Sequence, residues 1–415
     1  GASLMKRFSA PPYLAYGLFG LPLALVALPI YVYVPQFYAE RFGMSLALIG
    51  ATLLIARVLD ACIDPLMGMW IDRSKYGYRR FILIALPLLA CGFLTLFHPP
   101  AVTQGPALAW FISTLLLVYL GFSLATIAHQ SWGAALTQKL NERSALTATR
   151  EACGLIGVIV AASLTGWLGL GWLSITFIIS LLLCSAVLLK LAPEPVRQPS
   201  LNSHWSMMLT PFQSLRFRWL FAVLVVNGIA AAIPATLFLF FAKDQLQLQQ
   251  YAGLFLMLYF TAAACSMPLW VALAKRHGEA RIWLLAMLLA AAAFVWAYGL
   301  SAGAALPFGL ICILSGLTLG ADLALPPALL AAVIHQAGHS GQREGAYFGA
   351  WSWATKMNLA LAAGISLPLL QQLGYVPGVV NSDGAHALAI GYALLPCALK
   401  LSAAAILWRA PLRDI

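Results

Sequence analysis

Long apolar stretches alternate with short polar connections along the whole chain, and they recur twelve times. Their approximate limits are 12–38, 44–71, 81–97, 107–134, 146–168, 171–191, 217–241, 251–274, 282–300, 306–335, 347–372 and 385–408. A transmembrane α-helix needs roughly 20 predominantly apolar residues. The pattern therefore predicts an all-α integral membrane protein with twelve transmembrane helices.

One long polar connection, 192–216, divides these stretches into six and six. The two halves resemble each other: 60–65 reads Asp-Ala-Cys-Ile-Asp-Pro, 263–268 reads Ala-Ala-Cys-Ser-Met-Pro, and a basic turn follows each. We predict a bundle over 1–191, a cytoplasmic linker over 192–216 and a second bundle over 217–415. Two pseudo-symmetric six-helix bundles are typical of a transporter whose site lies between them.

Composition and charge agree with a membrane location. Hydrophobic residues make up 62% of the chain and charged residues 9%, whereas a soluble domain carries about a quarter charged residues. The net charge of +11 comes mainly from loops on one side, which the positive-inside rule places in the cytoplasm together with both termini. We expect a monomer in the inner (plasma) membrane, with a small solute and the lipid bilayer as partners and no nucleic acid. The seven cysteines show no disulfide or zinc spacing.

Three charges interrupt the second apolar stretch. Arg57, Asp60 and Asp64 are spaced i, i+3, i+7, so they share one face of a helix. One charge at membrane depth costs at least ~2.5–3.5 kcal/mol on insertion scales. The three side chains should therefore face the protein interior or a water-filled cavity. A structural ion pair between Arg57 and one aspartate is the alternative, but it leaves the second carboxylate unexplained. We interpret the group as a functional site.

The sequence resembles the major facilitator superfamily, and within it the glycoside–pentoside–hexuronide cation symporters, the group of melibiose permease. The resemblance rests on 56–68 (Ala-Arg-Val-Leu-Asp-Ala-Cys-Ile-Asp-Pro-Leu-Met-Gly), the inner turn 72–79 and the sequence Gly-Gln-Arg-Glu-Gly at 341–345. Further matches are Phe37-Tyr38, Phe42-Gly43, Asn141-Glu142-Arg143, Arg150, Lys356 and 374–377. They follow the family's order through nearly the whole chain.

The resemblance implies cation-coupled symport of a carbohydrate-type or other small solute by alternating access. Asp60 and Asp64 match the cation-binding carboxylates, Thr126 a hydroxyl ligand and Lys356 the lysine that faces them. Either aspartate would bind Na⁺ if Na⁺ is the coupling ion. The family's asparagine between the aspartates is Ile63 here, and two adjacent carboxylates can share a proton, so we favour H⁺. No cofactor is expected.

The sugar-binding part of the family pattern is largely absent. Pro22 and His129 replace two aspartates that hold sugar hydroxyls in the family. A charged acceptor makes strong hydrogen bonds with a hydroxyl, so neutral disaccharides should bind poorly. An amphipathic, anionic or lysophospholipid-like solute is the alternative. A third possibility, a non-transporting membrane sensor or assembly partner, conflicts with the charges at the predicted cavity.

Several residues are candidates for substrate binding, and each has a structural alternative. His129 is either a hydrogen-bonded core histidine or a group that contacts substrate. Arg150 either pairs with Glu151 or recognises substrate. Asp322 either pairs with Lys356 or binds substrate. The remaining candidates are Arg57, Gln130 and Trp353, and core packing is the simpler interpretation for Trp353. The chain has no Gly-rich phosphate loop and no nucleophile elbow, so we do not expect an enzyme.

Overall fold

A computed structural model describes residues 10–32, 34–44, 46–136, 140–198, 205–376 and 378–415. All regular structure in these ranges is helical. The chain divides into two compact units: unit 1 comprises Gly1–Pro211 and Ile334–Trp353, and unit 2 comprises Phe212–Val333 and Ala354–Ile415. Each unit is described by itself below.

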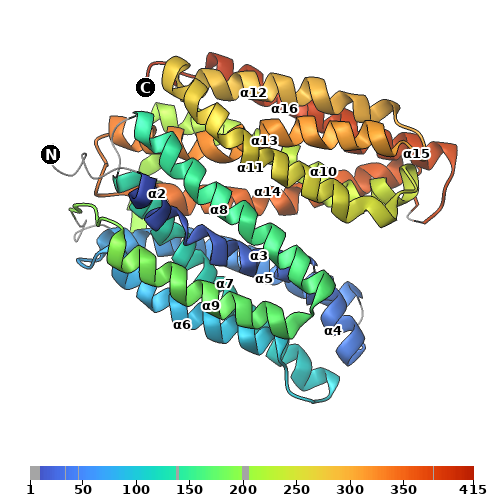
Figure 1. Cartoon of the computed structure of the whole chain (residues 1–415), viewed down its shortest axis with the longest axis horizontal. Helices are drawn as coiled ribbons and strands as arrows, with labels where there is room; N and C mark the ends of the chain where they lie inside the picture. The colour runs from blue at the N-terminus through green and yellow to red at the C-terminus, as the bar shows by residue number, and fades with distance from the viewer. Residues whose placement is uncertain (1–9, 33, 45, 137–139, 199–204, 377) are drawn as a thin grey trace. The chain divides into compact units, whose positions relative to one another are not determined.

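The long helices of unit 1 pack in neighbouring pairs, with α6 along α7 and α3 along α8 (Figure 1). The helices are α2 (Ala10–Gly17), α3 (Gly20–Val32), α4 (Val34–Phe42), α5 (Leu46–Arg73), α6 (Tyr78–Phe97), α7 (Gln104–Leu136), α8 (Leu140–Trp167) and α9 (Leu170–Leu191). The 3₁₀-helix η1 (Trp205–Gln213) leads into unit 2.

Unit 2 contains α-helices joined by short 3₁₀- and π-helical turns. The helices are α10 (Leu215–Phe240), α11 (Ala252–His277), α12 (Glu279–Phe294), α13 (Ala305–Gln336), α14 (Glu344–Gln372), α15 (Ser382–Ala389) and α16 (Leu395–Arg409). Two π-helical turns, η2 (Phe241–Gln245) and η5 (Ile390–Leu394), and two 3₁₀ turns, η3 (Gln249–Tyr251) and η4 (Val295–Gly299), connect them. The unit boundaries fall within η1, α13 and α14, so that the end of α13 and the first part of α14 belong to unit 1.

The first predicted span, 12–38, contains a described interruption, a turn that separates α2 from α3. The turn lies at Leu18 and Phe19, three residues before Pro22. Proline has no N–H to donate and fits best in the first turn of a helix, and Pro22 lies in the first turn of α3, which begins at Gly20. Pro29 lies inside α3 and removes one backbone hydrogen bond. The turn thus interrupts the helix that the hydropathy of this stretch alone predicts.

Ten helical stretches in the described residues are long and apolar enough to cross a membrane. They correspond to ten of the twelve predicted spans. The other two predicted spans coincide with α5 and α14, helices of 28 and 29 residues. At 1.5 Å per residue each extends about 40 Å, more than the roughly 30 Å of a bilayer's hydrocarbon core.

Candidate functional site

The three charges of α5 are all buried in the protein. The exposed fraction is 9% for Arg57, 4% for Asp60 and 0% for Asp64. Apolar neighbours at other positions of the same helix, such as Ile55 and Leu59, are exposed. The helix therefore directs its charged stripe inward and its aliphatic side chains outward, as the cost of a charge in lipid requires.

Helix α7 supplies a complementary stripe to α5. The guanidinium carbon of Arg57 lies 5.7 Å from the centre of the Tyr119 ring, a cation–π contact. One turn further along both helices, Ser123 Oγ donates a hydrogen bond of 2.7 Å to Asp60 Oδ1. Residue numbers rise together in the two pairs, so α5 and α7 run in the same direction here.

Thr126, predicted as the hydroxyl ligand, continues this stripe of α7. Its Oγ1 is buried and has no hydrogen-bond partner among the described residues. The hydroxyl that bonds Asp60 is instead that of Ser123, three residues earlier, which was not among the sequence predictions. Because 119, 123 and 126 are spaced i, i+4, i+7, they share a helical face. Any serine or threonine on this face of α7 could therefore have been predicted as a hydrogen-bond partner of the aspartates.

His129 and Arg150 meet around a buried tyrosine, Tyr16 of α2. The Tyr16 hydroxyl donates 2.7 Å to the backbone oxygen of His129, and His129 Nε2 lies 2.8 Å from the backbone oxygen of Tyr16. Arg150 Nη1 donates 3.3 Å to the Tyr16 hydroxyl, and Nη2 pairs with Glu151 Oε1 at 3.2 Å. Gly133 leaves room for the hydroxyl, since a Cβ there would clash with it.

For both His129 and Arg150, the structure shows the contacts expected of the structural alternative given above. His129 is a hydrogen-bonded core histidine, 1% exposed, and its ring centroid lies 4.3 Å from that of the tilted Tyr16 ring. Arg150 is 6% exposed and pairs with Glu151. Tyr16 escaped the sequence analysis because an aromatic residue at the start of an apolar span is the commonest kind of core residue.

Asp322 of α13 has an ion-pair partner, and it is not Lys356. Its Oδ2 accepts from Lys400 Nζ on α16, and its Oδ1 accepts from Trp283 Nε1 at 2.8 Å and Asn227 Nδ2 at 3.4 Å. The predicted alternative of an Asp322–Lys356 pair is therefore wrong. The sequence did give an indication of Lys400, because a lysine inside the twelfth apolar stretch needs an acidic partner.

The remaining candidates are placed on α7 and α14. Gln130 is half-buried, and its Oε1 has no hydrogen-bond partner among the described residues. Trp353 is half-buried and ends the part of α14 that belongs to unit 1. Lys356 is buried, 8% exposed, and belongs to unit 2. Its predicted approach to Asp60 and Asp64, which lie in unit 1, stays a prediction.

The last turn of α5 caps the beginning of α14. Asp72 accepts a hydrogen bond of 2.8 Å from each of two successive backbone N–H groups, those of Gly345 and Ala346. The first N–H groups of a helix have no partner within it and favour a negative charge. The backbones approach so closely that a Cβ on Gly68 would clash with the backbone oxygen of Gly345. The Asp72 carboxylate and the glycines Gly68 and Gly345 thus stabilise and permit one close helix crossing in unit 1.

The chemistry available at the α5 stripe is that of a small cation. No group of three or more His, Cys, Asp or Glu side chains suited to a metal ion occurs in the described part of the chain. Two carboxylates one turn apart, with hydroxyl groups on the facing helix, instead offer oxygen atoms only. Such oxygens can exchange a proton or coordinate a hard cation.

Comparison with known proteins gives one family for almost the entire chain. The profile of the family described as MFS/sugar transport protein matches residues 12–414. The isoprimeverose transporter of Lactiplantibacillus pentosus is 25% identical over 402 residues, covering 91% of this chain and 83% of that protein. The glucuronide carrier protein homolog of Escherichia coli is 24% identical over 408 residues, covering 91% and 87%.

Solved structures agree in fold. A bacterial homologue of the iron transporter ferroportin, in its outward-facing state, superimposes with a TM-score of 0.74 at 16% identity, covering 97% of this chain and 99% of that one. The transporter FucP in the outward conformation gives a TM-score of 0.71 at 14% identity, with 95% and 98% covered. At this level of identity the likeness concerns the fold alone.

Proposed function

The chain belongs to the MFS/sugar transport protein family, and on that premise we propose that it is a symporter that couples a cation gradient to uptake of a carbohydrate-type solute. The observation that carries the proposal is the buried stripe of α5 with its partners on α7. Relatives whose names specify isoprimeverose and glucuronides as cargo support a carbohydrate as the solute class.

Asp60 and Asp64 would receive the coupling ion. Asp60 is held in position by the Ser123 hydroxyl, and Thr126 continues the same face of α7 toward the next turn. A proton or Na⁺ that binds there would neutralise a negative charge in a buried site and so weaken the electrostatic attraction between the carboxylates and Arg57. Because a carboxylate's attraction to a cation in a poorly hydrated interior is strong, such neutralisation can bias which side the transporter opens to.

We favour H⁺ as the coupling ion. Na⁺ needs several oxygen ligands, and Ile63 offers none where the family has an asparagine. Two carboxylates on one helical face lower their mutual repulsion by binding a proton.

The alternative of an anionic or amphipathic solute is weakened. It rested on the replacement of two sugar-binding aspartates by Pro22 and His129, and on Arg150, His129, Gln130 and Thr126 as polar groups free to line a cavity. In unit 1 Arg150 is engaged with Tyr16 and Glu151, and His129 is engaged with Tyr16. A carbohydrate-type solute therefore remains the better proposal.

The test is uptake by purified protein in proteoliposomes, with a panel of pentosides and glucuronides and an imposed H⁺ or Na⁺ gradient. Asp60→Asn removes the charge but keeps an oxygen that can accept from Ser123, so the fold should be retained. We expect this variant to lose gradient-driven accumulation while it still exchanges substrate across the membrane. Ser163→Ala, which removes a hydroxyl bonded only within its own helix, is the control.

Accumulation by the Asp60→Asn protein at the wild-type level would show that this carboxylate does not couple transport. Uptake that depends on Na⁺ and persists without a proton gradient would replace H⁺ by Na⁺.

A further inference from the structure

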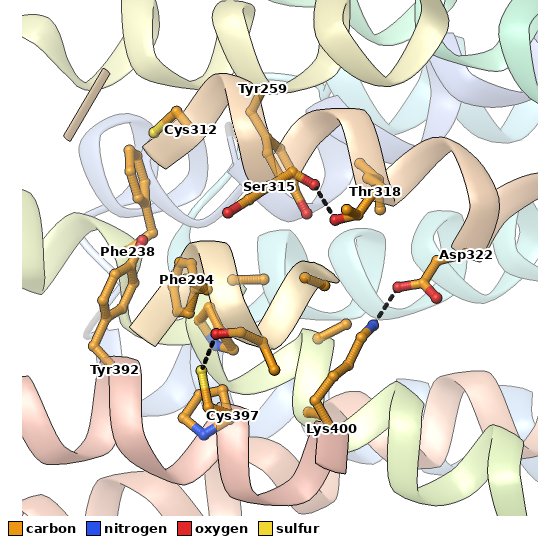
Figure 2. Close-up of a pocket in the computed structure, with 18 of the residues that line it drawn as sticks. Phe238, Tyr259, Phe294, Cys312, Ser315, Thr318, Asp322, Tyr392, Cys397 and Lys400 are labelled. Carbon is orange, nitrogen blue, oxygen red and sulfur yellow. Dashed lines mark hydrogen bonds and ion pairs between the residues drawn. The ribbon is translucent and has the colours of Figure 1, made fainter. Parts of the chain in front are cut away.

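Unit 2 contains a chamber separate from the α5 stripe. Its volume is about 180 Å³, and side chains of α10, α11, α12, α13 and α16, with Tyr392 of η5, form its walls. Figure 2 shows Asp322 and Lys400 facing each other at one end of the chamber, with Phe238 and Tyr392 at the other. Nothing in the proposed coupling site uses these residues.

The walls are mainly apolar and aromatic. Phe238, Tyr259, Phe294 and Tyr392 all line the chamber, so a flat apolar ring entering it would meet several ring faces and edges. Aromatic pairs in offset or edge-to-face contact attract each other beyond simple burial. The lining therefore favours an aromatic or cyclic guest over a flexible polar one.

The charged end of the chamber is already neutral. The Asp322 carboxylate accepts from Lys400, from Trp283 at 2.8 Å and from Asn227 at 3.4 Å. A charged guest would add an uncompensated charge to an apolar chamber, which is strongly unfavourable. The guest should therefore be uncharged.

Hydroxyl groups along the walls leave hydrogen bonds to be made. Among the described residues no hydrogen-bond partner is found for the buried Ser315 hydroxyl, which lines the chamber together with Tyr259 and Tyr392. Lys400 also has more N–H groups than the one directed at Asp322. A single hydroxyl on the guest could both accept from and donate to such groups.

Size restricts the guest to one ring. An apolar cavity of about 150 Å³ accommodates benzene, and typical drug-sized ligands need roughly 300 Å³ or more. A sugar ring of similar size would place most of its hydroxyls against apolar walls. The side chains of Ala231, Ala235 and Leu256 line the chamber and are exposed, so they form its entrance.

We propose that this chamber is a binding site for a single uncharged ring that carries a hydroxyl group, a ligand of the phenol type. The site goes beyond the proposed transport function and does not depend on it. Its recognition elements are the aromatic walls for the ring, and the Ser315 hydroxyl with Lys400 for the polar group.

The experiment uses 4-fluorophenol, which is uncharged at neutral pH, as a ¹⁹F NMR probe of the full-length protein in detergent. Ala235→Phe places a large side chain at the exposed entrance, and Ala292→Phe makes the same change at an exposed position of α12 outside the lining. We expect saturable binding to wild type and to Ala292→Phe, and affinity at least tenfold lower in Ala235→Phe. If Ala235→Phe does not fold, Leu256→Trp replaces it.

Fluorobenzene tests the role of the hydroxyl, and its affinity should be about tenfold lower. Equal affinity for fluorobenzene would overturn the polar recognition. Saturable binding that is unchanged in both entrance variants would place the site elsewhere. Absence of saturable binding to wild type would show that the chamber is not a binding site for this class of molecule.

Discussion

Removing the Tyr16 hydroxyl tests whether His129 and Arg150 serve the structure of unit 1. Tyr16 is fully buried, donates to the His129 backbone oxygen and accepts from Arg150 Nη1. Tyr16→Phe keeps the ring and its contact with the His129 ring but deletes both hydrogen bonds. Arg150 keeps its pair with Glu151.

The expected loss of stability follows from these two contacts. A neutral hydrogen bond contributes about 1 kcal/mol, and one to a charged group about 1.5–3 kcal/mol. Together they predict a loss of roughly 3 kcal/mol. For a unit of 150–250 residues 1 kcal/mol shifts Tm by about 2–4 °C, so Tm should fall by roughly 6–12 °C.

Thermal unfolding of the purified protein in detergent measures this shift. Tyr251→Phe is the matched control, because Tyr251 is 45% exposed and its hydroxyl can bond to solvent. Uptake by Tyr16→Phe well below its Tm should remain close to wild type. If Tyr16→Phe melts within about 1 °C of Tyr251→Phe but loses transport, the hydroxyl serves substrate handling and our structural interpretation is wrong.

Two further predictions concern the crossing of α5 and α14 in unit 1. Gly68→Ala should destabilise the protein by about 1–3 kcal/mol, the usual cost of overpacking, because its Cβ would clash with the Gly345 backbone. Gly171→Ala in α9 is the control, because a Cβ there meets no neighbouring atom. Equal Tm values for the two variants would contradict the close crossing. Burial raises the pKa of Glu344, which lies ahead of the predicted span 347–372, to about 7. The protonated form of Glu344 contributes stability that is fully present below the unfolded-state pKa and is lost as the pH rises through about 7. Glu344→Gln should therefore increase Tm more at pH 8 than at pH 5. A gain in Tm that does not depend on pH would refute the prediction.

Helical periodicity and hydropathy were enough to predict the membrane class, most helix positions and the buried stripe of α5. Arg57, Asp60 and Asp64 could be assigned to one inward face because their spacing matches the helix repeat and a charge facing lipid is costly. The first span shows the limit of hydropathy, since a turn at Leu18 and Phe19 separates α2 from α3 within one apolar stretch.

Tertiary structure alone decided the partners. Ser123 and Thr126 differ by less than one turn, and only the packing of α7 on α5 determines which hydroxyl reaches Asp60. Lys400 lies 78 residues from Asp322, and its approach depends on how α16 and α13 pack. Local sequence determines which face of a helix is polar, but the rotation of one helix against another follows from the packing of all their side chains, and that is a property of the folded unit.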